Sequence, residues 1–425
     1  MKSEINFRAA LMALLAGAII MTGTRAASAG EVMTLQQALR LAETHNPQVR
    51  AARYRWNAAE HQIIQNYTPA DPQFAYTNFD SWRGFLKDSG YHNITVTQSL
   101  QFPGKGLLQG TTARRAADIA ALTYMAAVRD IRAQAETDYY QIQLDLALND
   151  LMAENLTNLK RVLNVTKIAY MANLATQGDL INAKFALEAD RESLRQQAVT
   201  ILNDKTALNI LLARRPDEPL EVDRKFDLAQ FEATLDQVID KAVSSRQEIL
   251  QAALTEKNQQ TAVALAQLEY APDYTVGFGF DHWLIPSFAP QPNHTETWNA
   301  LISFNVPIFF WAKNEDIKQA RENLDAAGED LESIRLQTEG TVTALYRQIL
   351  RSRETALLYR NTLVPLAQQA FEVMLVAYEG GKTDFTTLIS TLRQWHDARA
   401  TYLQSVNALL AGKVALEQAA GGTLQ

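Results

Sequence analysis

The amino-acid sequence repeats itself once, after about 200 residues. Matches occur in predicted helices, in a predicted strand and at single prolines, which an Ala/Leu-rich helical composition alone does not explain. The matched segments are Thr34–Gln37 with Thr234–Gln237, Phe79–Trp82 with Phe280–Trp283, Ser99 and Pro103 with Ser303 and Pro307, and Leu180-Ile181 with Leu388-Ile389. Chance similarity between helices is the alternative. The repeat predicts one supersecondary unit built twice around a shared core.

Each copy predicts the same order of elements: helix, strand, loop, strand, long helix, turn, helix. The chain is therefore expected to have five parts. They are a signal peptide at residues 1–29, a first repeat at 30–215, an equatorial linker at 216–233, a second repeat at 234–420 and a C-terminal tail at 421–425. The expected fold class is mainly α-helical, with long antiparallel hairpins and a small contribution of β-strands.

The first residues predict a secretory signal peptide. A basic start at Lys2 and Arg8 precedes an apolar run, residues 9–23, and the small-residue cleavage site Ala27-Ser28-Ala29. The run is too short for a comfortable membrane span, which favours a cleaved signal over an anchor. The chain has no cysteine, so an exported protein of this sequence relies on packing or assembly. Its net charge of −7 argues against nucleic acid as a partner, because such binding needs a basic surface.

Short segments with alternating apolar and polar residues predict the strands. The apolar positions are Ile94, Val96, Leu100 and Phe102 in the first copy and Tyr274, Val276, Phe278, Phe280, Trp298, Ala300, Ile302, Phe304 and Val306 in the second. The strand near residues 74–82 alternates poorly and rests on the repeat alone. An ordinary half-buried sheet and the wall of a membrane barrel both fit this pattern. Trp82, Trp283, Trp298 and Trp311 lie near predicted strand ends, as interface aromatics do, and favour the barrel.

The predicted helices are unusually long. Residues 111–177 contain neither glycine nor proline and would form a helix about 100 Å long. Its partner, residues 316–379, contains Pro365, which should kink or locally open the helix. A first helix at residues 35–65 and a last one at 180–214 are each about half as long, so two of them could lie end to end beside the long one. These lengths predict a rod with strands at one end, turns at the other and the linker midway.

Four strands are too few to close a membrane barrel. An open strand edge in lipid would leave backbone groups without hydrogen-bond partners, so other copies of the chain would have to complete the barrel. After the signal, no segment has around 20 apolar residues, so any membrane crossing would use strands. The alternative is a soluble periplasmic coiled-coil scaffold or adaptor protein, which the helices alone do not exclude.

At this point the sequence resembles a family. The Thr34-Leu35-x-x-Ala38-Leu39 opening, Asn46-Pro47, Val364–Ala367 and Ala377-Tyr378-x-Gly380 resemble TolC-type outer membrane efflux proteins. The resemblance implies a homotrimer with a twelve-stranded barrel in the outer membrane and a helical tunnel (an α-barrel) across the periplasm. It also implies docking to a periplasmic adaptor and an inner-membrane transporter, which supplies the energy. The protein would be a passive exit duct.

Within that family, residues 98–105 (QSLQFPGK) resemble the CzcC-like cation-efflux branch, with heavy-metal cations as candidate cargo. A second interpretation is that Gly104 and Lys105 form the strand-to-helix turn. A third places Lys105 against lipid phosphates. The sequence by itself leaves the transported substrate and the identity of the pump open.

The resemblance also implies a gate at the helical tips, closed by rings of acidic side chains. The candidates are Asp179 in the first tip and Lys382, Asp384, Thr387 and Ser390 in the second. Thr387 and Ser390 fall where TolC carries paired aspartates, so an acidic ring from the second copy would depend on Asp384, offset by Lys382. In the alternative interpretation, Asp179 and Asp384 only stabilise helix N-termini.

No catalytic constellation is expected. The six histidines are scattered without HExxH or metal-ligand spacing, and there is no Walker loop or G-x-S-x-G elbow. We therefore predict no enzymatic activity, no cofactor and no metal site. A periplasmic hydrolase would need a convergent cluster that the sequence does not contain.

Overall fold

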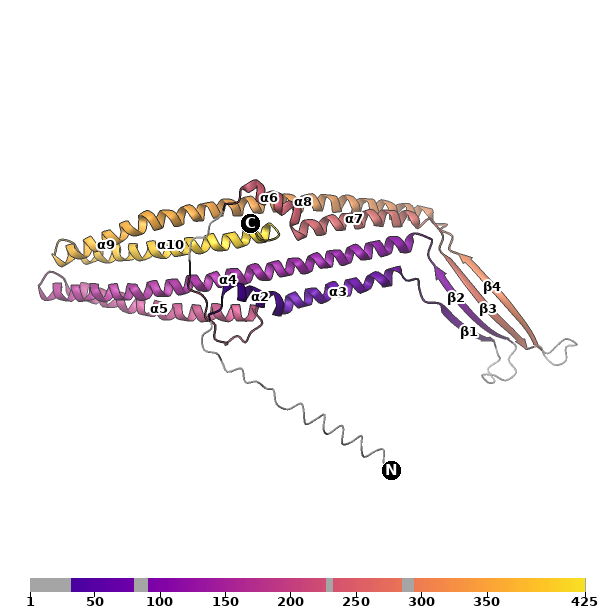
Figure 1. Ribbon diagram of the computed structural model, residues 1–425, viewed down its shortest axis with the longest axis horizontal. Coiled ribbons are helices and arrows are strands. Elements are labelled where there is room, and N and C mark those ends of the chain that lie inside the picture. Colours follow the sequence, from indigo (N-terminus) through magenta and orange to yellow (C-terminus); the bar gives the residue numbers. More distant parts are fainter. Residues whose placement is uncertain (1–31, 80–90, 227–231, 285–293, 425) are drawn as a thin grey trace, which may run out of the picture.

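The computed structural model describes residues 32–79, 91–226, 232–284 and 294–424. The protein is an elongated rod of antiparallel helices with a β-sheet at one end (Figure 1). The predicted signal peptide, Trp82 and residues 227–231 of the predicted linker lie outside the described residues. The helices are α2 (Leu35–His45), α3 (Pro47–Tyr67), α4 (Lys105–Met171), α5 (Gln177–Leu211), α6 (Leu235–Ser245), α7 (Gln247–Leu268), α8 (Phe310–Leu358), the π-helical turn η1 (Tyr359–Leu363), α9 (Val364–Glu379) and α10 (Phe385–Ala419). The strands are β1 (Gln73–Phe79), β2 (Tyr91–Leu100), β3 (Tyr274–Leu284) and β4 (His294–Phe304).

The two halves of the chain contain the same order of elements, with closely matched lengths. α2 and α6 each have 11 residues, and α5 and α10 each have 35. α2 and α6 also begin with the same capping box, in which the threonine side chain accepts from a backbone N–H and the glutamine side chain reaches back to the cap. The boxes are formed by Thr34 with Gln37 and by Thr234 with Gln237. The same local start signal thus precedes two helices of equal length.

The helix predicted for residues 35–65 is two helices, and the single-helix prediction is wrong. Asn46 ends α2 and caps α3, its side chain accepting from the backbone N–H groups of Gln48 and Val49. Pro47 has no N–H to continue the first helix but fits the first position of the next. The Asn46 amide also donates to the Leu211 carbonyl at the end of α5, over 2.9 Å. The break therefore lies where α5 ends.

The long helices differ in continuity. α4 runs for 67 residues, about 100 Å at the α-helical rise, and ends at Met171 before a turn in which Asn173 has φ 61°. Its counterpart is α8, the turn η1 and α9, of 49, 5 and 16 residues. Pro365 is the second residue of α9, which begins where η1 ends, and this confirms that it locally opens the helix, since proline lacks the N–H that bonds one turn back. Across the described ranges, none of the helices has an apolar stretch long enough to span a membrane.

Half-length helices flank the long ones end to end (Figure 1). α3 and α5 lie along α4, and α7 and α10 lie along α8 and α9. In the second half, the Gln247 amide donates to the Gly421 carbonyl over 3.1 Å and the Ser245 hydroxyl to the Ala420 carbonyl over 3.2 Å. Both halves thus close their helix junction midway along the rod.

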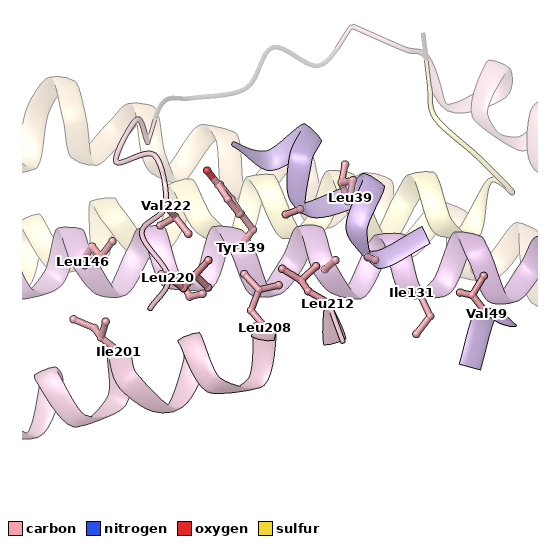
Figure 2. Packing of buried hydrophobic residues seen from close by; sticks show 14 residues of the cluster. Leu39, Val49, Ile131, Tyr139, Leu146, Ile201, Leu208, Leu212, Leu220 and Val222 are labelled. Atoms are coloured by element: carbon pink, nitrogen blue, oxygen red, sulfur yellow. The ribbon is translucent and has the colours of Figure 1, made fainter. Parts of the chain in front are cut away.

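A hydrophobic core fills this middle level (Figure 2). Met33 forms a parallel bridge with Val222, which ties the start of the chain to the linker. The buried Tyr139 of α4 donates its hydroxyl to the Met33 carbonyl over 2.9 Å and accepts from the Asp223 N–H over 3.0 Å. The labelled residues of this cluster are Leu39, Val49, Ile131, Tyr139, Leu146, Ile201, Leu208, Leu212, Leu220 and Val222. Residues 220–223 of the linker are therefore packed against the middle of α4.

The four strands form one antiparallel sheet in the order β1-β2-β3-β4, with β2 and β3 joining the two halves. Tyr76 pairs with Ile94, Ile94 with Phe280, and Phe280 with Trp298. In the hairpin register, Phe280 therefore corresponds to Tyr76 and not to Phe79, as the sequence match suggested. The reason is that side chains alternate between faces with period two, so a match shifted by an odd number of residues exchanges the faces.

Candidate functional site

One face of the sheet is apolar and exposed. All even-numbered strand positions share this face, because every paired register joins residues of equal parity. Phe278, for example, is 68% exposed. The large apolar side chains that the structure leaves exposed here are Phe74, Tyr76, Ile94, Val96, Val276, Phe278, Trp298, Ile302 and Phe304. The alternation predicted from sequence is confirmed, and it produces a continuous apolar surface with no covering layer in the described chain.

At the end farthest from the helices, this apolar face stops at a polar row. Asn78, His92, His282 and Glu296 lie opposite one another across the four strands. The next row towards the helices consists of Tyr76, Ile94, Phe280 and Trp298. The Tyr76 hydroxyl bonds to His92 Nδ1 over 2.7 Å, and the Phe280 and Trp298 rings lie 4.9 Å apart. A polar row above an aromatic row is the arrangement of a membrane interface.

The placement of the tryptophans differs from the prediction. Trp283 is next to the end of β3, but Trp298 lies inside β4 and Trp311 lies in the first turn of α8. The strand-end prediction is wrong for these two because β4 begins at His294 and the chain becomes helical at Phe310. Both side chains are exposed, and Trp311 contacts Phe309 and Phe310 edge-on.

These aromatic groups bracket the apolar face. From Trp298 to its end at Phe304, β4 runs about 20 Å at the usual spacing of a strand, and the apolar band on outer-membrane barrels is about 25 Å tall. The exposed Ile308, Phe309, Phe310 and Trp311 follow at its helical end. An aromatic group therefore lies at each border of the band.

The odd-numbered face of the sheet carries mostly small and polar residues at its described positions, with the exposed Leu301 of β4 as an apolar exception. Gly277 and Gly279 of β3 are covered by neighbours from adjacent strands, Thr97 and Asn299 respectively. Beyond them, Asp281 accepts from the amides of Asn93 and Asn299, both over 2.6 Å. One carboxylate is thus held by donors from the strands on either side.

Lys105 lies at the corner where β2 turns into α4. Gly104 has φ +103°, a backbone conformation that favours glycine, which confirms its predicted role in the turn. Lys105 is only 2% exposed, and its Nζ lies 3.0 Å from the Asp273 carboxylate and 3.4 Å from that of Glu269. The interpretation that Lys105 meets lipid phosphates is therefore wrong: its ammonium is enclosed by carboxylates from the other half of the chain.

The same corner affects the ionisation of Asp273. Burial would raise the pKa of this carboxyl, but the Phe102 N–H, 2.8 Å away, and the Lys105 ammonium together hold the pKa below its usual range. Asp273 therefore stays ionised and ties the end of β2 to the start of β3.

The gate candidates lie at the tips opposite the sheet. Asp179 forms a capping box with Thr176, accepting from its N–H and hydroxyl over 2.8 Å each. Asp384 caps α10, accepting from the Thr387 N–H and hydroxyl over 2.9 Å each, and the Ser390 hydroxyl donates to the Thr387 carbonyl. These hydrogen bonds, the backbone one first, hold the pKa of Asp384 below its usual range.

The two tips pack against each other. An apolar cluster contains residues of α4, α5, α9 and α10, among them Val162, Leu187, Phe371, Phe385 and Leu388. The turn at Gly381 lies beside the Leu174 side chain. Lys382 and Asp384 are exposed, whereas Asp179, Thr387 and Ser390 are half-buried. The structure thus brings all five candidates to one end of the rod.

Two ionic features at the middle of the rod were missed by the sequence reasoning. Arg129 of α4 binds both carboxylate oxygens of Glu248 of α7, over 3.0 and 2.6 Å. Burial would raise the pKa of Glu248, but the Arg129 guanidinium lowers it to about 2. This bridge links the first and second halves of the chain, which share no local sequence signal for it.

The second is a group of carboxyls between α4 and α5. Asp145 is buried and accepts from the amides of Gln141 and Gln197, over 3.0 and 2.9 Å. Burial, followed by the hydrogen bond and charge of Asp145 and the charge of Asp138, raises the pKa of Asp204 to about 7. Among the residues that the structure describes, no three or more histidine or acidic side chains gather as metal ligands.

The sequence profile of the outer membrane efflux proteins matches residues 38–214 and 238–422. The chain belongs to this family. The predicted resemblance is therefore confirmed, and the matched segments cover both halves and omit the start of the chain and the linker. As a member, the protein is an efflux protein of the outer membrane whose helical part lies in the periplasm.

Individual relatives agree with this assignment. The chain is 22% identical over 381 residues to the cobalt-zinc-cadmium resistance protein CzcC of Cupriavidus metallidurans, covering 87% of this chain and 86% of the relative. It is 23% identical over 414 residues to the outer membrane protein TolC of Escherichia coli, with 88% and 81% covered. Among solved structures, the transmembrane channel CusC matches with a TM-score of 0.78 at 16% identity, over 91% of this chain and 92% of that chain.

Proposed function

We propose that three copies of this chain form a passive duct through which an inner-membrane transporter and a periplasmic adaptor export their substrate. Four strands from each copy would form a twelve-stranded barrel in the outer membrane, and the helices a tunnel across the periplasm. The protein performs no chemistry in this proposal. The internal repeat supports this assembly, because the contacts that join the two halves within one chain can be repeated between neighbouring copies.

The observation that carries the proposal is a difference between α5 and α10. These helices correspond residue by residue, because 389 − 181 and 410 − 202 both equal 208, the spacing between their starts. Ile389 and Leu410 are 9% and 7% exposed, whereas Ile181 and Leu202 are 57% and 63% exposed. The same apolar positions are thus buried in α10 and exposed in α5. A second copy of the chain packed against α5 would bury them.

The element that covers them is also indicated. Within the chain, α10 packs against α4, and Arg399 of α10 binds Glu154 of α4 over 2.7 Å. The element corresponding to α4 in the second half is α8 with α9. Leu366, Val373 and Val376 of α9 are exposed apolar residues. We therefore place α5 of one copy against α8 and α9 of the next.

The sheet would close into a barrel by repeating, between copies, the strand pairing that already joins its two halves. β1 and β4 are its edges. The β1–β2 hairpin and the β3–β4 hairpin have the same register at an offset of 204 residues, because Tyr76 corresponds to Phe280 and Ile94 to Trp298. The internal pair Ile94–Phe280 then corresponds to Trp298 facing Tyr76 of the next copy. By the same register, Ala300 would face Phe74. Edge pairing of this kind satisfies the backbone groups that lipid cannot.

Cysteine cross-linking tests this closure, and the chain offers a cysteine-free background. Ala300→Cys combined with Phe74→Cys places two thiols opposite each other, about 5 Å apart between Cβ atoms, if the proposed register is right. Oxidation in membranes should then give dimers and trimers on a denaturing gel. The control pairs Ala300→Cys with Tyr76→Cys, two residues out of register. A trimer of detergent-extracted protein without the predicted cross-link would overturn the register; a soluble monomer would overturn the duct.

The tip residues are proposed as the periplasmic gate. Three copies would present Asp179 and Asp384 three times each around the axis, and such rings favour cations. Lys382 would offset part of this charge, and Thr387 and Ser390 would line the same level. Their capping hydrogen bonds fix the carboxylates in place and are compatible with both roles.

Divalent heavy-metal cations are the proposed cargo. The support is the match to CzcC, a cobalt-zinc-cadmium resistance protein, over most of both chains. Removing this chain from its native cells should raise their accumulation of at least one of these metals. Unchanged metal accumulation together with retention of an organic compound would overturn the cargo but not the duct. No observation favours the soluble scaffold, since the exposed apolar sheet face would be in water.

A further inference from the structure

We infer that Asp281 sets the cation preference of the duct at the end of the barrel farthest from the helices. The inference rests on the proposed function and assigns a selectivity residue within the strands, separate from the tip gate. It starts from the chemistry of the polar sheet face, the only face that can line water if the apolar one meets lipid.

Asp281 differs from every other described position on that face. The odd-numbered strand residues are neutral side chains or glycines, such as Thr95, Thr97, Gly277 and Ser303. Among the described strand residues of this face, Asp281 is the one that carries a charge at neutral pH. A barrel of three copies would therefore have three fixed charges on its inner wall, all negative and at one level.

The carboxylate is held in position. The Asn93 amide donates to one of its oxygens and the Asn299 amide to the other, both over 2.6 Å. The donors come from β2 and β4, so the group is clamped from both sides of β3. Hydrogen bonds from two amides limit rotation of the side chain. Asn93 and Asn299 are thus positioning residues for Asp281.

Gly277 and Gly279 precede Asp281 on the same face of β3 and add no side chain to the wall. The Asn299 side chain packs over Gly279, where any larger residue would collide with it. The glycines therefore let Asn299 lie against the wall beside Asp281.

The ligand class is a mobile cation that passes the ring. The amide donors occupy both oxygens, and the described residues form no cluster of metal ligands, so a tightly held ion is not expected. A threefold negative ring raises the local concentration of cations and lowers that of anions, an effect that salt screens. The preference should therefore be clearest at low ionic strength.

Glu296 provides a matched control. It lies on β4 opposite His282, one residue along from the Thr297–Asp281 pair, and so at nearly the same height. Its even position puts it on the outer face. Neutralising Asp281 or Glu296 removes one negative charge per copy at nearly the same height. The two changes differ in the face of the sheet on which the charge is lost.

The experiment compares the cation-to-anion permeability ratio of wild-type, Asp281→Asn, Asp281→Lys, Glu296→Gln and Glu296→Lys channels in planar bilayers under a KCl gradient. Asp281→Asn should lower the ratio about twofold or more at 0.1 M salt, where the screening length is about 10 Å, and much less at 1 M. Asp281→Lys should lower it further, and both Glu296 variants should leave it unchanged. Asn93→Ala should give a smaller decrease, while its conductance stays.

A second measurement does not depend on the tip gate. Asp281→Cys should react with a membrane-impermeant charged thiol reagent added outside intact cells, and Phe278→Cys, within the apolar band of the other face, should not. Conducting Asp281→Lys channels with unchanged selectivity, or a shift caused by the Glu296 variants instead, would overturn the inference. Wild-type protein that forms no channel would overturn the proposed function, not the assignment of Asp281 within it.

Discussion

The two strand-to-helix corners follow the same course but are sealed differently. After β2, the chain turns through Gly104, and Lys105 is buried between Asp273 and Glu269 of the other half. After β4, Pro307 leads to exposed Ile308, Phe309, Phe310 and Trp311, and no glycine intervenes. The first corner is enclosed within one chain, where the buried ammonium of Lys105 is paired with carboxylates of the same chain. The second lies beside the edge strand β4 and carries an apolar surface, as the proposed contact with lipid and another copy would require.

The same contrast extends along the rod. α5 exposes apolar positions that α10 buries, and α4 carries Asp145 against Asp204 of α5, where the second half has Ser352 and Gly412 at the corresponding positions. The first half, in which α5 exposes apolar residues, is thus also the half with a pair of carboxyl groups between its helices, Asp145 and Asp204. The two halves therefore share the order of their elements and the lengths of their matched helices α2 and α6 and α5 and α10, but differ in the exposure and charge of their surfaces.

The largest expected effect is that of removing the buried charge at the first corner. Lys105→Met should lower the free energy of unfolding by about 3 kcal/mol, because it leaves two carboxylates without their cation; their partial exposure keeps the loss at the low end of the range for buried pairs. Lys313→Met, at the second corner, should cost about 0–1 kcal/mol, since Lys313 forms only long, partly exposed pairs. Thermal or denaturant unfolding in detergent measures both. Equal losses would refute the contrast between the corners.

The next effect tests the backbone of the same corner. Gly104→Ala should destabilise the protein by about 1–3 kcal/mol, because φ +103° strains any residue with a Cβ. Gly328→Ala, inside α8 with no atom near the added methyl, should be neutral or stabilising by up to about 1 kcal/mol. A harmless Gly104→Ala would mean that the corner can relax.

The carboxyl pair of the first half predicts an unusual dependence on pH. The folded pKa of Asp204, about 7, lies above its usual value of 3.8, so the folded state resists its ionisation. This group favours folding most below about pH 4, and its contribution is lost as the pH rises to about 7 and beyond. Asp204→Asn should therefore raise the melting temperature relative to wild type at pH 8, with little difference at pH 4. Glu322→Gln, on the exposed surface of α8, should show no such dependence; a constant difference for Asp204→Asn would argue against the coupling.

The smallest effects concern the two tips. Asp179→Ala should cost about 1 kcal/mol through the lost capping box, and so should Thr176→Ala. Only Asp179→Ala should also weaken cation block or alter conductance in planar bilayers, because it removes the charge as well as the cap. Asp384→Ala repeats the test in the second tip. Identical conductance in all variants would leave both aspartates as helix caps and remove them from the gate.

Much of the fold could be read from local signals. Thr34 and Thr234 start matched helices, Pro365 opens the second long helix, and the period-two segments form strands with the expected apolar face. These features depend on short stretches of chain, where propensity and alternation act directly. The prediction of one helix across Asn46 was wrong although Pro47 follows it in the sequence. The apolar residues on both sides of the break keep a helical spacing, which favoured a single helix.

The sites depended on distant parts of the chain. Lys105 is separated by more than 160 residues from Glu269 and Asp273, and its burial follows only when the corners of both halves meet. The clamp on Asp281 requires the register of three strands, two of them from one hairpin and one from the other. The sequence by itself determined a duplicated, mostly helical rod with alternating strands, because local hydrogen bonding and side-chain periodicity specify such elements. Only the tertiary structure decided which charges are buried, paired or aligned on one face, because those properties belong to the packing of segments that the sequence keeps far apart.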